Sequence, residues 1–193
     1  VTGRDLTING NIRVAVLPAP ALVVSDVSLA NSDGATARHM VTLKSAEIRL
    51  ALAPLLAGQV KVETLKLIEP VIYLERLSDG SANWEFKAMK GATSRDDNPT
   101  KSGATIAGRS AAPPIAFDNL SIENATLIYR DSISSVTERI EKISARIAAA
   151  SLQGPMETIG TGTVRGVPLT FNLNVGEIIH QRTVPFNLRA SAV

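Results

Sequence analysis

Few residues of this sequence could do chemistry, and their spacing does not assemble an active site. The two histidines, His39 and His180, stand in polar surroundings and belong to no His-x-x-x-His or Asp-x-His pattern of the kind that holds a metal. Paired carboxylates occur at 96–97 and at Glu138 and Glu141. The first pair lies in a polar stretch that cannot hold an acid–base geometry, and the second is typical of a solvated face.

Motifs and composition exclude further classes of function. The chain has no cysteine, no Gly-x-Ser-x-Gly elbow, no phosphate-binding loop and no dinucleotide fingerprint. We therefore predict no catalytic site, no cofactor and no metal, so the protein is expected not to be an enzyme. Twenty basic and 18 acidic residues give a net charge of +2, without the concentrated basic face that a nucleic-acid binder needs.

Apolar residues alternate with polar ones along most of the chain, which predicts β-strands. The clearest case is 167–175, where Val167, Leu169, Phe171, Leu173 and Val175 alternate with Thr170, Asn172 and Asn174. The aliphatic side would either pack as the core of a sandwich or line a groove that holds acyl chains, and alternation does not separate the two. The candidate residues for this core or groove lining are Leu6, Ile8, Ile12, Val14, Val16, Ile48, Leu50, Leu52, Leu65, Leu67, Leu169, Phe171, Leu173 and Val175.

Two segments carry helix signals. Residues 54–57 follow helix rules, because Pro54 suits a first turn and Gly58 suits the end. The segment 135–149 has capping-box spacing at Ser135 and isoleucines at helical intervals, but its apolar residues also alternate. Local propensity alone favours a helix in the second segment.

The chain divides into three parts. Residues 1–86 and 115–193 carry the strand patterns, and the second part is expected to continue the sheet of the first. Residues 87–114 are polar and rich in Gly, Ser and Thr, so they are expected to form a flexible loop.

Short stretches of the two strand-rich parts resemble each other. The stretch 27–31 is similar to 120–124, and 65–73 is similar to 120–129. Such repeats favour a sheet that grows along one axis.

The single tryptophan has two readings. Trp84, in Asp79-Gly-Ser-Ala-Asn-Trp84, would either cover the end of the core or contact a membrane interface, and the first is favoured. No apolar run reaches the length of a membrane span, and the sequence begins at Val1. We therefore expect an excised part of a longer protein.

Several segments, in order, resemble the AsmA family of Gram-negative bacteria. The opening Thr2-Gly-Arg-Asp-Leu-Thr-Ile-Asn-Gly-Asn11 is similar to the start of that family's proteins. Further similar segments cover most of the chain outside 87–114, and they are 17–22, 27–31, 51–58, 65–75, 79–84, 120–129, 152–155 and 166–169.

The resemblance implies a fold, a location and a function. It implies an elongated, curved antiparallel sheet that forms an AsmA/TamB-like β-groove, with one or two short helices, and it makes 138–151 a strand. It implies a periplasmic protein held at the inner membrane by an N-terminal helix absent from this chain. It also implies phospholipid acyl chains as ligands, for non-enzymatic lipid handling or transport between the inner and outer membranes. The alternative is a scaffold that assists outer-membrane assembly proteins.

Overall fold

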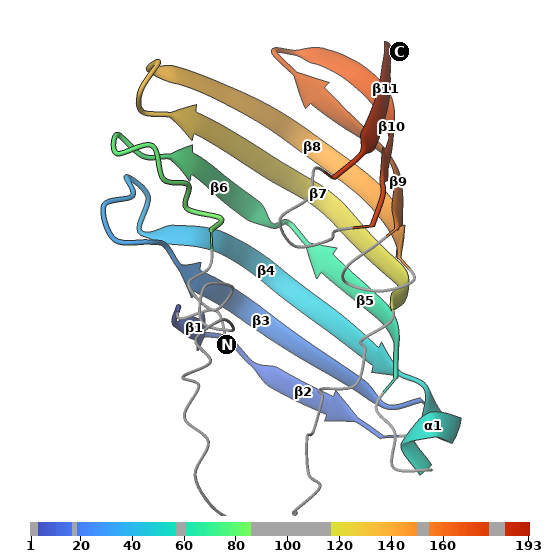
Figure 1. Ribbon diagram of the computed structural model, residues 1–193. Coiled ribbons are helices and arrows are strands. Elements are labelled where there is room, and N and C mark those ends of the chain that lie inside the picture. The colour runs from blue at the N-terminus through green and yellow to red at the C-terminus, as the bar shows by residue number, and fades with distance from the viewer. Residues whose placement is uncertain (1–3, 17–18, 57–60, 86–116, 150–154, 178–183) are drawn as a thin grey trace, which may run out of the picture.

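The computed structural model describes residues 4–16, 19–56, 61–85, 117–149, 155–177 and 184–193. These residues form a single curved layer of 11 strands with a short helix at one corner (Figure 1). The elements are β1 Leu6–Ile8, β2 Ile12–Ala15, β3 Ala21–Ala30, β4 His39–Leu50, α1 Leu52–Leu56, β5 Val62–Ile68, β6 Val71–Arg76, β7 Phe117–Asp131, β8 Val136–Ala149, β9 Met156–Val164, β10 Val167–Val175 and β11 Phe186–Ala192.

The predicted mainly β fold is confirmed, and its strand order is β1-β3-β4-β5-β7-β8-β9-β10-β11. Strand β2 pairs with β3 beyond β1, and β6 pairs with both β4 and β7 beyond β5. The pairing differs from the expected antiparallel sheet at one place, because β5 and β6 both run parallel to β7. Parallel neighbours need a long connection, and β7 begins at Phe117, 41 positions after β6 ends at Arg76 (117 − 76).

The parallel pairing brings two similar sequence segments together. Leu65 pairs with Leu120 and Leu67 with Ile122, an offset of 55 (120 − 65). The same offset continues in β6, where Ile72 pairs with Leu127. The similar stretches 65–73 and 120–129 therefore lie side by side.

A row of residues with left-handed backbone crosses the sheet. We call it the crease, and its members are Asp26 in β3, Glu69 between β5 and β6, Asn124 in β7 and Lys142 in β8, with φ between 48° and 53°. These residues lie near one another across neighbouring strands. Asp26 stands opposite Lys44 in the register of β3 and β4, and the Lys44 ammonium forms an ion pair with Glu69 at 2.8 Å. The crease shifts the alternation, so that Val24 and Val27, three residues apart, share one apolar cluster.

Of the two segments with helix signals, one forms a helix and the other forms a strand. Helix α1 forms near the predicted 54–57 but spans Leu52–Leu56, so Leu52, one of the predicted lining residues, lies on the helix and not on a strand. Strand β4 ends at Leu50, because the chain turns into the helix there. In contrast, 136–149 is the strand β8, and the family resemblance gave the better prediction there than local propensity did. The predicted loop 87–114 lies outside the described residues.

Candidate functional site: the apolar face of the sheet

Strand register places the aliphatic side chains on one side of the sheet. Directly paired residues point to the same side, and Leu22 pairs with Ile48, Ile48 with Leu65, Leu65 with Leu120, and Leu120 with Ile147. The same side continues through β9 and β10 to β11. We call this side the apolar face. Its apolar members are Leu6, Ile8, Ile12, Val14, Leu22, Val24, Val27, Leu29, Val41, Leu43, Ala46, Ile48, Leu50, Val62, Leu65, Leu67, Ile72, Leu74, Leu120, Ile122, Ala125, Leu127, Tyr129, Val136, Ile140, Ile143, Ala145, Ile147, Ala149, Met156, Val164, Val167, Leu169, Phe171, Leu173, Val175, Phe186, Leu188, Ala190 and Ala192.

The opposite side, the polar face, carries mostly hydroxyl, amide and charged groups. Lys66 pairs with Ser121 and Ser121 with Arg146, while Thr170 pairs with both Thr161 and Ser191. The sheet is therefore a two-sided layer with one side suited to water.

No second layer covers the apolar face within the described part of the chain. The described elements in close contact are hydrogen-bonded neighbours in the sheet, as expected for a single layer. The buried apolar side chains are few for such a surface, namely Val24, Val27, Met40, Ala46, Ala125 and Ala145. Towards the two edges, Val14 and Phe186 are 71% and 72% exposed.

The predicted lining residues fall into two groups, those on the apolar face and those outside it. All of them lie at register positions of the apolar face except Val16, which follows β2, and Leu52, which begins α1. The sequence prediction included no residue of β3, β7 or β8 and so omitted Leu22, Leu120 and Ile147. Those strands have the same alternation, but the crease interrupts it, so a simple period-two pattern does not reveal them.

The two larger depressions described on the sheet do not resemble an active site. One of about 750 Å³ lies where β9, β10 and β11 meet, and Met156, Val175 and Phe186 of the apolar face line it together with polar neighbours. The other, about 960 Å³, lies on the polar face and includes Arg146 and Glu157. Among the described residues there is no His, Asp and Glu cluster that could hold a metal. His39 begins β4, and His180 falls outside the described residues.

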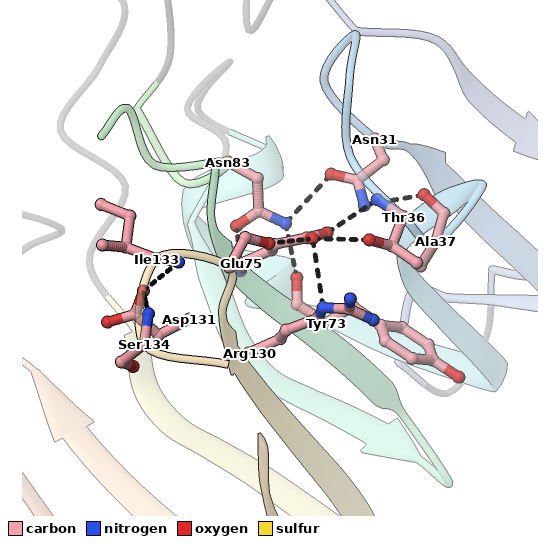
Figure 2. Close-up of polar contacts among 11 residues, drawn as sticks. Asn31, Thr36, Ala37, Tyr73, Glu75, Asn83, Arg130, Asp131, Ile133 and Ser134 are labelled. Carbon is pink, nitrogen blue, oxygen red and sulfur yellow. Dashed lines mark hydrogen bonds and ion pairs between the residues drawn. The ribbon is translucent and has the colours of Figure 1, made fainter. Parts of the chain in front are cut away.

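A polar network holds one end of the sheet together (Figure 2). Glu75 of β6 is 4% exposed, and its carboxylate accepts hydrogen bonds from the Thr36 amide at 2.8 Å and hydroxyl at 2.6 Å. Ser132 donates a further bond at 3.1 Å, and Arg130 forms an ion pair at 3.7 Å. Burial alone would raise the pKa of Glu75, but these donors hold it below its usual range.

Asn83 is the buried plug at this end of the sheet. Its amide nitrogen donates to Asn31 at 3.0 Å and to the Tyr73 carbonyl at 2.8 Å, and its amide oxygen accepts from the Glu75 backbone at 2.9 Å. The prediction that Trp84 is the plug was wrong, because Trp84 is 40% exposed whereas Asn83 is 0% exposed. Only an amide can satisfy these backbone and side-chain groups together.

The indole of Trp84 lies beside Tyr129, with ring centroids 6.3 Å apart. Tyr129 pairs with Leu74, so it belongs to the apolar face. The two rings therefore mark the end of that face next to the polar network.

Comparison with known protein families matches the AsmA family over residues 1–183. No curated protein matches the chain. Within the described residues, no helix has both the length and the apolar content that a membrane crossing requires.

Proposed function

The chain belongs to the AsmA family, and we propose that its apolar face binds the acyl chains of phospholipids that move between the inner and outer membranes. AsmA membership is consistent with a role in envelope biogenesis, and the proposal specifies that role. In it, the protein acts without catalysis in the periplasm, held at the inner membrane by a helix that precedes this chain.

The continuous apolar face, which no second layer covers among the described residues, carries the proposal. Soluble proteins rarely leave so extended an apolar surface to water unless it meets a ligand, a partner or a membrane. Each methylene that the face removes from water contributes about 0.8 kcal/mol, so a single acyl chain would bind through many small increments. Contacts with aliphatic side chains have no preferred direction, so the face could accept acyl chains of differing length and unsaturation.

Matched substitutions on neighbouring residues test the proposal. Leu173 belongs to the apolar face, and the adjacent Asn174 to the polar face. Leu173→Asp in the membrane-anchored, full-length protein should lower the phospholipid that co-purifies at least several-fold by mass spectrometry, whereas Asn174→Asp should leave it unchanged. Equal lipid content in both variants, or no phospholipid on the wild-type protein, would overturn lipid binding by this face.

A specific feature favours the alternative of a scaffold for outer-membrane assembly. Strand β11 lies at an edge of the sheet, all its residues are exposed, and it contains neither Pro nor Lys to block a further strand. Such an edge suits β-augmentation by a partner. Crosslinking from Asn187 in cells that yields assembly proteins, together with no lipid on the apolar face, would favour the scaffold.

A further inference from the structure

Charge on the apolar face is confined to one end of the sheet. Among the register positions of this face in the described strands, the charged residues are Arg76, Asp131 and Glu138. Arg76 lies 4.0 Å from Asp131, and Arg165 of the β9–β10 turn donates to Glu138, with its Nε at 3.2 Å. Arg76, Asp131 and Glu138 lie at the ends of β6, β7 and β8, and Arg165 contacts Glu138 from the β9–β10 turn.

Aromatic groups accompany these charges. Tyr129 stands directly opposite Glu138 and two residues before Asp131, and Trp84 lies against Tyr129. Tyr and Trp favour the boundary between hydrocarbon and polar headgroups, because one part of each ring system is apolar and another forms hydrogen bonds. Charged and aromatic groups thus combine at this end as they do at a membrane surface.

The other end of the same face has a different character. There Ala149 pairs with Met156, Met156 with Val175, and Val175 with Phe186, all of them apolar. The depression of about 750 Å³ lies at this end and is lined by all four of them. From Val136 to Ala149 the strand β8 covers 13 steps (149 − 136), about 43 Å, so the two ends are well separated.

We propose that a phospholipid lies on the apolar face in one orientation, with its headgroup at Arg76, Asp131, Glu138 and Arg165 and its acyl chains pointing towards the middle of the sheet. This inference rests on the proposed lipid binding. One leaflet of hydrocarbon is about 15 Å deep, half of a bilayer core, so a lipid held at the charged end keeps its headgroup far from Phe186. The two arginines meet the phosphate, and the aromatic rings contact the region of the glycerol esters.

The 193 residues contain no cysteine, so the orientation is measurable with single labels once any cysteine elsewhere in the full-length protein is replaced by serine. Val136 and Phe186 are exposed positions of the apolar face at its charged and apolar ends, 45% and 72% exposed. Each is replaced by Cys in the full-length protein, labelled with a fluorophore, and loaded with phosphatidylcholine that carries a nitroxide on the headgroup or at the chain end. The headgroup nitroxide should quench the Val136→Cys label at least three-fold more than the Phe186→Cys label.

The outcomes separate the two proposals. Equal quenching of both labels by the headgroup nitroxide, or stronger quenching at Phe186→Cys, overturns the orientation while lipid binding stands. Absence of quenching by either nitroxide at either site counts against lipid binding itself.

A charge-neutralised pair gives the matched control. Glu138→Gln with Arg165→Gln should abolish the difference between the two labels. The ion pair Arg139–Glu141 lies on the polar face of the same strand at 2.7 Å, and Arg139→Gln with Glu141→Gln should preserve the difference. A preserved difference in the first double variant overturns the role of the charged end.

Discussion

Glu69, between β5 and β6, lies beside Asn124 of β7, and both have left-handed backbone, with φ of 48° and 53°. The Glu69 amide donates to the Glu123 carbonyl at 2.8 Å, and the Thr126 amide donates to the Pro70 carbonyl at 2.8 Å, so hydrogen bonds flank the pair on both sides. Because the two segments are similar in sequence, each bends at the equivalent residue. The crease therefore keeps both halves of these strands facing the same apolar side.

Because Asn124 has a positive φ, we expect glycine to be tolerated better than valine at this position, which is the reverse of the usual order in a strand. Valine is ordinarily the better strand residue and glycine the worse, but a β-branched residue at positive φ is strained. We expect Asn124→Val to lower the free energy of unfolding by about 1–2 kcal/mol and Asn124→Gly to leave it within about 0.5 kcal/mol. Urea titration measures both.

Thr126, two residues along the same strand, is the control. There Thr126→Val should be neutral and Thr126→Gly destabilising, as in an ordinary strand. If the valine variant were more stable than the glycine variant at both positions, the left-handed backbone at Asn124 would be contradicted.

Asn83 should be the most sensitive residue of the polar network. Asn83→Ala leaves a buried backbone amide, a buried carbonyl and the Asn31 amide oxygen without a partner. We expect the free energy of unfolding to fall by about 2–4 kcal/mol. Asn174→Ala, on an exposed side chain, should cost less than about 0.5 kcal/mol. Similar losses at the two positions would show that the plug is unimportant.

The network also predicts a pH dependence of stability. Because the pKa of Glu75 is lower in the folded chain than its usual value of 4.5, the stability it contributes is present above that value and is lost as the pH falls through the folded pKa. Denaturation midpoints of the wild type should therefore fall between about pH 5 and pH 2, and Glu75→Gln should flatten this fall. An unchanged slope in Glu75→Gln, with Glu157→Gln as the exposed control, would refute the assignment.

Alanine substitutions at two glycines of β9 should have very different effects on stability. A Cβ on Gly160 would lie 2.6 Å from the Ser144 carbonyl oxygen and 2.7 Å from Phe171, whereas the nearest atom to a Cβ on Gly162 is 3.4 Å away. Gly160→Ala should destabilise by about 1–3 kcal/mol, because β8, β9 and β10 must separate to admit the methyl group. Gly162→Ala should change stability by less than about 1 kcal/mol, and thermal melts of both variants check the contrast. Equal melting temperatures would contradict the close packing of β8 against β10 across Gly160.

The sequence predicted the sheet well because alternation is a local property. Leu169, Phe171, Leu173 and Val175 are read directly from their spacing, and the register places them on one face. The sequence did not predict the crease, because Glu69 and Lys142 belong to residue types with no preference for positive φ. The parallel pairing of β5 with β7 was also missed, since pairing between distant segments depends on the whole sheet.

The polar network shows a different limit of sequence analysis. Trp84, the single tryptophan of the sequence, was predicted to cover the end of the core, but the buried residue is its neighbour Asn83. A lone asparagine in a polar turn gives no sign that it will satisfy groups from Asn31, Tyr73 and Glu75. Its role becomes visible only when three distant segments are placed together.

Photo-crosslinking along β10 in living cells tests the central claim most directly. A photoreactive amino acid is placed in turn at each position from Leu169 to Val175 of the full-length protein, and crosslinked phospholipid is quantified by mass spectrometry. The apolar face predicts lipid adducts at 169, 171, 173 and 175 and none above background at 170, 172 and 174. Equal adducts at odd and even positions, or none at any position, would contradict it.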